Sequence, residues 1–257
     1  MSSAKEKRPL VPVDRVPAAK LPGPLFVTLI TVIDRAGRNH MCGRYALHSA
    51  TEAIAAAMGM KPPTADDAPR YNIPPGTRPP NVNCRSGKRA IEHFLWGFRP
   101  GWANDDAPRP INARAEKVAE SPYFRSAFAR HRCLVPANGW FEWKRDGTTK
   151  IPYYLGHREG VLLFFAGLFD PGGEEAGPSF AIITHAAADA FKPIHDRMPL
   201  VLDPASRDAW LDPDLNDRVA IRKAVRPLDP ATLYAYPVSS AVNKPANDYE
   251  ELLEPIG

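Results

Sequence analysis

The sequence predicts an α+β fold: a single domain with a curved antiparallel sheet or barrel-like core, flanked by short helices. Strand-like runs dominate the middle of the chain, helical patterns are short and peripheral, and no alternation of strands and helices indicates a parallel sheet. Proline makes up 29 of the 257 residues, about twice its usual share. Because each proline removes a backbone donor and fixes φ, long helices, coiled coils and helical repeats are excluded.

The first predicted elements follow residue 42. A strand over 43–47 leads into a helix that Ser49 or Thr51 caps and Gly59 ends. A proline-rich loop over 62–75 comes next, and residues 91–98 alternate in the way that a strand does.

The second half of the chain supplies most of the sheet. Ser121-Pro122 is expected to open a short helix through Phe128, with the serine as its cap. A helix also starts at Asp203-Pro204 and runs through Trp210. Between these helices lie five strand-like runs, at 133–135, 140–144, 151–155, 161–169 and 180–184.

Residues 1–40 are expected to lie outside this domain, which spans residues 41–257. They hold five prolines and one short apolar run, so they form a disordered tail or precede a true start at Met41. They also hold seven basic and three acidic side chains, which is the whole net charge of +4. The remaining 26 basic and 26 acidic side chains cancel, so global charge gives no support for nucleic-acid binding by the domain.

Several classes of protein are excluded. No run reaches the roughly 18 apolar residues of a spanning helix, and the apolar run at 25–33 lacks the flanks of a secretory signal. The three cysteines form neither a CxxC pair nor an even set, so neither a zinc site nor a disulfide framework is indicated. We expect a cytoplasmic protein without a metal or another cofactor.

Three side chains could carry chemistry. Glu142 lies between Phe141 and Trp143 in a predicted strand, and a carboxylate on a largely buried sheet needs partners. It is either a structural ion-pair member or a catalytic group. The same alternatives hold for His195, while a single Cys42 is most often a small buried apolar residue.

Eight short motifs follow one another from Cys42 to the C-terminus. They are Met-Cys-Gly-Arg-Tyr at 41–45, Arg-Tyr-Asn-Ile at 70–73, Trp-Gly-Phe at 96–98, Pro-Gly-Trp at 100–102, Ile-Asn-Ala-Arg-Ala-Glu at 111–116, Asn-Gly-Trp-Phe-Glu-Trp at 138–143, Ile-His-Asp-Arg-Met-Pro at 194–199 and Pro-Val-Ser at 237–239. Taken together, these motifs resemble those of the SOS response-associated peptidase family, also described as abasic-site processing proteins.

The resemblance implies that Cys42 becomes the N-terminal residue and bonds covalently to ring-opened abasic sites in single-stranded DNA. An open abasic site is an aldehyde, and a 1,2-aminothiol can condense through its amine and then close through sulfur to a thiazolidine. Only an N-terminal cysteine has both groups free. At neutral pH only a minority of either group is nucleophilic, so a neighbouring base must help.

The resemblance also implies roles for other residues. Glu142 would exchange protons with the Cys42 amine, and His195 would act on the sugar hydroxyl during ring opening and on the imine step. Asn112 would orient the adduct through hydrogen bonds.

Further residues would bind the strand. Arg44 and Arg114 would hold flanking phosphates, for which the planar guanidinium is suited, and Asn72 would join them. Trp102 would stack on unpaired bases. Trp96, in an alternating strand, is expected in the core instead.

The chain departs from this scheme at its start, because the nitrogen of Cys42 is an amide behind 41 residues and cannot form an imine. Initiation at Met41, or self-cleavage by the Cys42 thiol with Glu142 and His195 assisting, would free it. Two other functions stay open: a thiol peptidase with Cys42 as nucleophile and His195 as base, and a non-catalytic single-strand binder.

Overall fold

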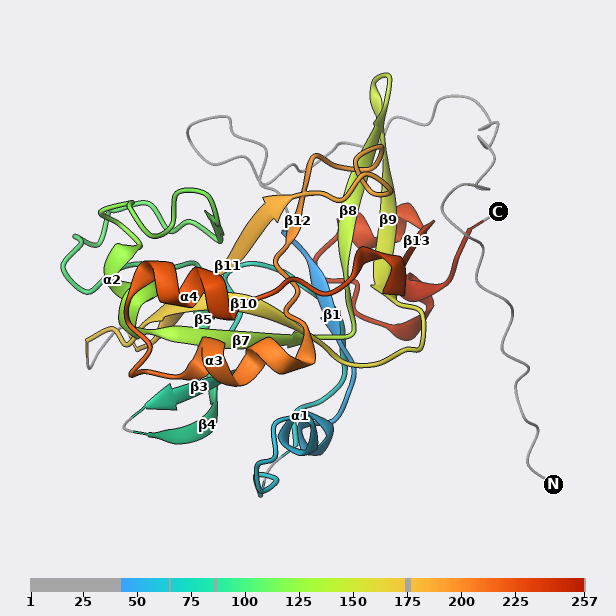
Figure 1. Cartoon of the computed structure of the whole chain (residues 1–257). Coiled ribbons are helices and arrows are strands. Elements are labelled where there is room, and N and C mark those ends of the chain that lie inside the picture. Colours follow the sequence, from blue (N-terminus) through green and yellow to red (C-terminus); the bar gives the residue numbers. More distant parts are fainter. Residues whose placement is uncertain (1–42, 65, 86, 174–176, 257) are drawn as a thin grey trace.

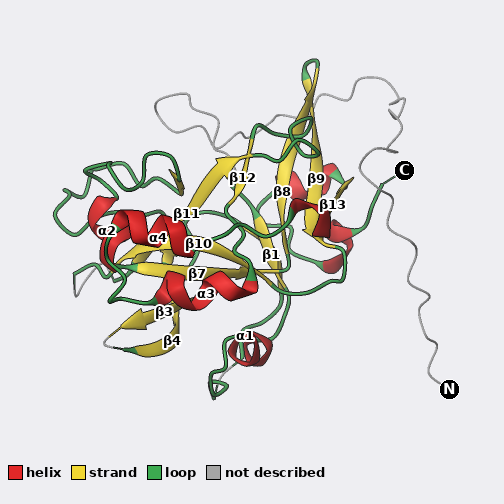
Figure 2. Ribbon diagram, in the orientation of Figure 1, coloured by secondary structure: helices red, strands yellow, loops and turns green. Residues whose placement is uncertain are grey.

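The computed structural model describes residues 43–64, 66–85, 87–173 and 177–256, which form two sheets surrounded by short helices (Figures 1 and 2). The predicted α+β class is confirmed. The predicted tail over residues 1–40, together with Met41 and Cys42, lies outside the described residues.

The first sheet has five strands in the order β13-β9-β8-β1-β2, and all its pairs are antiparallel. The strands are β1 (Tyr45–Leu47), β2 (Arg70–Ile73), β8 (Gly139–Asp146), β9 (Thr149–His157) and β13 (Leu233–Pro237). Gly139 is required where β8 starts, because a Cβ there would lie 2.3 Å from the carbonyl oxygen of Leu155.

The second sheet has eight strands, of which six follow the order β12-β11-β10-β7-β3-β4. Their pairs are antiparallel, whereas the short strands β5 and β6 pair with β11 in parallel, an arrangement that the sequence did not predict. The strands are β3 (Pro80–Arg85), β4 (Lys88–His93), β5 (Leu95–Trp96), β6 (Asn112–Arg114), β7 (Arg132–Ala137), β10 (Leu163–Asp170), β11 (Ser179–Ala186) and β12 (Arg197–Pro199).

The helices are short, as the proline content requires. They are α1 (Thr51–Ala57), α2 (Arg125–Arg130), α3 (Arg207–Leu211) and α4 (Arg218–Ala224), with 3-10 turns at Pro204–Ser206, Pro230–Thr232, Ser240–Asn243 and Glu250–Leu253.

The predicted helix caps are wrong in detail. Neither Ser49 nor Thr51 caps α1 with its side chain; instead the backbone N–H of Thr51 donates to Asp66 Oδ1 at 2.6 Å. Gly59 does follow the helix, with φ of 61°. Ser121 precedes a turn rather than capping α2, whose N-cap is Phe124.

Two predicted boundaries also differ from the structure. The predicted loop over 62–75 contains the edge strand β2, which pairs with β1, a partner that its own sequence does not reveal. The predicted strand over 91–98 is divided at Phe94 into β4 and β5, because these two strands pair with different neighbours. The five predicted strands between residues 133 and 184 are confirmed.

The main core lies on one face of the five-stranded sheet. Tyr45 and Trp140 contact Phe165 of the other sheet edge to face, with ring centroids 6.2 and 5.8 Å apart. Trp96 is 1% exposed and contacts Tyr45 at 5.2 Å, so the expectation that Trp96 belongs to the core is confirmed.

A second cluster covers the opposite face of the five-stranded sheet. There the C-terminal residues Val238, Val242 and Leu252 pack on Phe141 and Tyr154. Successive residues of a strand point to opposite faces, so Trp140 and Glu142 face the main core while Phe141 and Trp143 face the C-terminal segment.

Candidate functional site

Glu142 is the first residue of the candidate site. It lies in the middle of β8, is only 3% exposed, and shares its face of the sheet with Trp140. A carboxylate is rarely buried to this extent without a specific partner. Its position fits the prediction that this side chain is either structural or catalytic, and the strands around it decide what it can reach.

The start of β1 lies against Glu142. Tyr45 pairs with Trp140, the N–H of Phe141 donates to the carbonyl of Arg44 at 2.9 Å, and the same register continued by two residues sets Gly43 opposite Glu142. Cys42 lies outside the described residues and is the neighbour of Gly43 in the sequence.

The segment that contains Asn112 reaches the same region from the other sheet, through Ile111. A Cβ built on Gly43 would lie 3.8 Å from Cδ1 of Ile111, the residue before Asn112. The carbonyl of Ile111 accepts bonds from Trp96 Nε1 and from the N–H of Ile182, both at 3.0 Å. These two bonds fix the entry into β6, and thus the position of the half-buried Asn112.

His195 precedes β12 and is held in a neutral state. Its Nδ1 lies 3.0 Å from the N–H of Arg197 and 3.1 Å from Oδ1 of Asp196, and one nitrogen cannot both accept and donate. Burial lowers the pKa of His195 below 6.5, with the Asp196 carboxylate opposing this shift and the charge of Arg145 adding to it. Because the neutral form is favoured and the Asp196 side chain is 84% exposed, we assign Nδ1 as the acceptor of the Arg197 N–H.

An ion pair between Arg197, which is largely buried, and Glu116, which is half exposed, connects the His195 segment to the Asn112 segment. Nη1 and Nη2 of Arg197 bind the two carboxylate oxygens of Glu116 at 2.7 and 3.0 Å, and Nη2 also donates to the carbonyl of Thr184 at 2.6 Å. Thr184 in turn pairs with Arg114 of β6. We call the Glu116–Arg197 pair the clamp; the sequence analysis gave neither of its residues a role.

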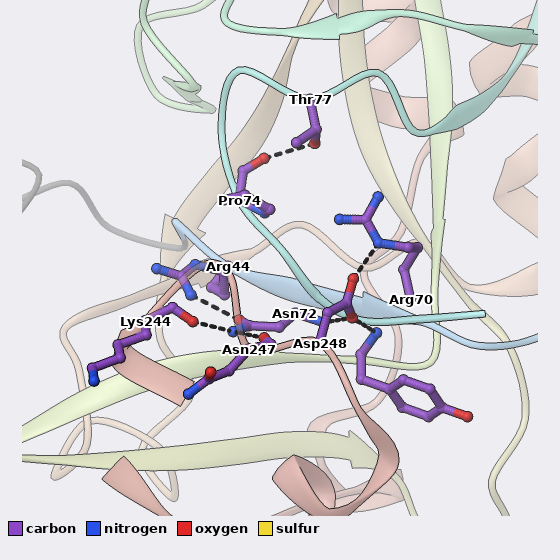
Figure 3. Close-up of polar contacts among 9 residues, drawn as sticks. Arg44, Arg70, Asn72, Pro74, Thr77, Lys244, Asn247 and Asp248 are labelled. Atoms are coloured by element: carbon purple, nitrogen blue, oxygen red, sulfur yellow. Dashed lines mark hydrogen bonds and ion pairs between the residues drawn. The ribbon is translucent and has the colours of Figure 1, made fainter. Parts of the chain in front are cut away.

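Arg44 and Asn72 lie together in a buried network, not on the surface (Figure 3). Nη1 of Arg44 donates to Oδ1 of Asn72 at 2.7 Å and to the carbonyl of Val242 at 2.8 Å. Burial lowers the pKa of Arg44 to about 10, so it is still charged at neutral pH. The amide nitrogen of Asn72 donates to the carbonyls of Val242, Lys244 and Asn247.

The same network continues to the sheet edge. One carboxylate oxygen of Asp248 accepts the N–H groups of Tyr71 and Asn72 at 2.5 and 3.0 Å, and the other binds Arg70. The C-terminal segment therefore covers the edge of β2. Because a phosphate contact would require Asn72 to give up these bonds, we leave Asn72 out of the strand-binding surface that the sequence suggested. Arg44 uses Nη1 in this network, whereas its buried Nε has no hydrogen-bond partner among the described residues, so a phosphate contact by Arg44 stays a prediction.

The other two predicted strand-binding residues are accessible. Trp102 is 68% exposed and rests edge to face on Tyr123, with ring centroids 5.8 Å apart. Arg114 is exposed at the end of β6, two residues from Asn112. Their side chains can meet a ligand without rearrangement of the core.

The described part of the chain contains no group of three or more His, Cys, Asp or Glu side chains that could hold a metal ion. Within the same residues, none of the helices has the length and apolar character needed to cross a membrane. The groups that the described residues of the site offer are a buried carboxylate, an imidazole and an amide.

Comparison with known proteins identifies relatives over most of the chain. Residues 41–245 match the family described as SOS response associated peptidase (SRAP). The chain is 34% identical over 222 residues to the abasic site processing protein YoqW of Bacillus subtilis, covering 83% of this chain and 99% of the relative. It is also 34% identical over 226 residues to the abasic site processing protein YedK of Escherichia coli, covering 84% and 100%.

Solved structures give the same picture of the fold. A protein from Bacteroides thetaiotaomicron superimposes with a TM-score of 0.71 at 25% identity, covering 84% of this chain and all of the other. A phage-related protein from Bordetella bronchiseptica superimposes with a TM-score of 0.64 at 34% identity, covering 77% and 94%.

Proposed function

This chain belongs to the SOS response associated peptidase (SRAP) family, and on that premise we propose that it processes abasic sites in single-stranded DNA. In the proposed reaction Cys42 is the N-terminal residue and forms a thiazolidine with the aldehyde of the ring-opened sugar. The observation that carries this proposal is the register of β1 on β8, which pairs Tyr45 with Trp140 and, continued by two residues, sets Gly43 opposite the buried carboxylate of Glu142.

The first step is formation of an imine. The neutral amine of Cys42 attacks C1′ of the open sugar, and the resulting carbinolamine loses water. This loss needs proton transfer to the departing hydroxyl, and a carboxylate beside the amine can move protons between nitrogen and oxygen. Glu142 is suited to this because it is buried where little water competes for those protons.

The second step closes the ring. The Cys42 sulfur adds to the imine carbon, a C–S bond replaces one bond of the C=N pair, and the nitrogen takes up a proton. The product holds the strand through two bonds to one carbon, and no oxidant or cofactor is consumed.

His195 and Asn112 support these steps. An imidazole whose Nδ1 accepts the Arg197 N–H has its proton on Nε2, and so can donate that proton from Nε2. We assign it to the hydroxyl that is freed when the sugar ring opens. Asn112 would hold the adduct through its amide.

The test is capture that survives denaturation. A protein beginning at Cys42 is incubated with a single strand carrying one abasic site and run on a denaturing gel. Its Cys42→Ala variant and the full chain that keeps residues 1–41 are run beside it. We expect a shifted band for the Cys42-start protein alone. A shifted band for a Cys42-start protein whose amine is acetylated would refute the thiazolidine.

The family description favours a second activity, cleavage of a peptide bond by the Cys42 thiol with His195 as base. Peptidase activity needs the sulfur but not the free amine. Intact-mass analysis of the full chain with and without Cys42→Ala tests it, because self-cleavage leaves Cys42 first in the parent and Met1 or Ser2 first in the variant.

A further inference from the structure

The β8–β9 hairpin projects beyond the other described elements at the top of Figure 1. Its tip spans residues 144–150, with three basic side chains, Lys144, Arg145 and Lys150, and one acidic side chain, Asp146. The domain as a whole has no net charge, so this local excess of positive charge stands out.

The pairing of the strands places like charges together. Arg145 is directly opposite Lys150, and like charges in that relation destabilise a hairpin. Among the described residues, no carboxylate forms an ion pair with Lys144, Arg145 or Lys150. The hairpin thus keeps an arrangement that an external anion would stabilise.

The β3–β4 hairpin provides an internal comparison. There Arg85 is directly opposite Lys88, yet Arg85 pairs with Glu92 at 3.6 Å and lies over the rings of Phe94 and Phe169, 5.7 and 5.1 Å from their centroids. In the β3–β4 hairpin, Arg85 is thus stabilised by a carboxylate and two aromatic rings of the chain itself. No such ion pair or ring contact is found for Lys144, Arg145 or Lys150 among the described residues.

The β8–β9 tip lies next to the candidate site. Lys144 is on the same face of β8 as Glu142, two residues further out, which is about 7 Å along the strand. Arg145, on the other face, is close enough to His195 for its charge to lower the pKa of that imidazole. An anion bound at the tip would therefore be a near neighbour of whatever group occupies the site.

We propose that Lys144, Arg145 and Lys150 bind backbone phosphates of the same DNA strand whose abasic sugar occupies the site. This inference rests on the proposed function, from which it takes the identity of the anion. A strand that passes Glu142 presents a phosphate on either side of the sugar, and lysine and arginine are the side chains that bind phosphate oxygens. The tip would hold the strand to one side of the lesion.

The experiment measures the salt dependence of reversible binding. The full chain with Cys42→Ala, which can neither cleave itself nor bond covalently, is titrated with a fluorescent single strand that carries a stable tetrahydrofuran abasic analogue. Each phosphate contact in a single strand contributes about 0.7 to the slope of log K against log salt concentration. Replacing Arg145 and Lys150 by Gln should lower the slope by about 1.4, so between 50 and 200 mM salt the variant should lose about sevenfold less affinity than its parent.

The matched control replaces Arg85 and Lys88 by Gln, the same two residue types in the same register at the other hairpin. Its slope should equal that of the parent, and thermal melting should show that both variants are folded. An unchanged slope in the tip variant, or an equal decrease in the control, overturns the proposal.

Covalent capture by the Cys42-start protein distinguishes the phosphate-binding role of the tip from the thiazolidine chemistry of the proposed function. If the Cys42-start protein captures the strand but the tip variant has the same salt slope as its parent, only the role of the tip is overturned. If the tip variant has a lower salt slope but the Cys42-start protein captures nothing, only the thiazolidine chemistry is overturned. A parent that does not bind the strand overturns the role of the tip, and if the Cys42-start protein also fails to capture the strand, both proposals are overturned.

Discussion

Glu116→Gln tests whether the clamp holds His195 in place. Glutamine has nearly the same shape but keeps only one acceptor oxygen and no charge, so one of the two bonds to Arg197 and the ionic attraction are lost. A hydrogen bond to a charged group contributes about 1.5–3 kcal/mol when buried, and an exposed ion pair about 0.2–1. The Arg197 side chain is 11% exposed and that of Glu116 is 50% exposed, so we expect the variant to unfold with about 1 kcal/mol less free energy.

The effect on function follows from the position of Arg197. Its side chain binds Glu116 while its backbone N–H binds His195, so a weaker clamp loosens the imidazole. Since tenfold in rate corresponds to about 1.4 kcal/mol, a loss of this size predicts capture of abasic strands that is slower by about three- to tenfold at saturating DNA. Affinity for an intact strand should be unchanged, because the clamp acts on geometry at the reacting centre.

The pH dependence of the same variant gives an independent check. The hydrogen bond from Arg197 lowers the pKa of Glu116 in the folded protein. A carboxyl whose folded pKa is depressed stabilises the fold fully above its unfolded pKa of about 4.3 and loses that contribution as the pH falls through the folded pKa. The difference in unfolding free energy between the parent and the variant, measured with urea, should therefore be present at pH 7 and shrink below about pH 4.

The control for these measurements is Glu120→Gln. Glu120 is exposed in the same loop, and no ion pair joins it to another described residue. If Glu116→Gln and Glu120→Gln match in stability and in capture rate, the clamp does not position His195 and the reasoning is refuted.

Four further predictions concern single residues. Glu142→Gln should slow capture by about 10²–10⁴-fold without weakening reversible binding, because the amide cannot exchange protons, and a wild-type rate would exclude Glu142 as the base. The His195 ring should titrate below pH 6.5 by NMR, with stability falling as the pH drops between 6.5 and that folded pKa; a midpoint above 6.5 would contradict its burial. Asn72→Ala should lower the unfolding free energy by about 2–4 kcal/mol, whereas Asn104→Ala, at an exposed position, should leave it unchanged. If Asn72→Ala is instead fully stable but binds the strand weakly, Asn72 belongs to the binding surface. Trp102→Ala should leave stability unchanged and weaken strand binding by about 1–3 kcal/mol in fluorescence titration, and equal binding would exclude stacking.

The elements that the sequence predicted well are those whose signal is local. The alternation around Trp140, Phe141 and Glu142 predicts both the strand and the opposite faces of its residues, because side-chain direction in a strand has a period of two. Trp96 was predicted to be buried from the same kind of pattern, and it is.

Interactions that depend on distant partners could not be predicted in this way. Arg44 bonds to Val242, 198 residues away, and Arg197 bonds to Glu116, 81 residues away. From sequence alone, Arg44 has the charge expected of a phosphate ligand, and nothing near it indicates that a C-terminal carbonyl accepts a hydrogen bond from its Nη1. A similar limit explains β2, whose residues form a strand because β1 pairs with one edge and Asp248 binds the other.

The position of β1 also bears on why a terminal cysteine would be needed. β1 is only three residues long and lies between β8 and β2, and its register sets Gly43 at the buried carboxylate of Glu142. Under the proposed function, removal of the residues that precede Cys42 frees the nitrogen that attacks the aldehyde. A chain with a single extra residue before Cys42 tests this requirement, because it keeps the Cys42 thiol but leaves the Cys42 nitrogen acylated. Such a protein should bind abasic strands reversibly and capture none.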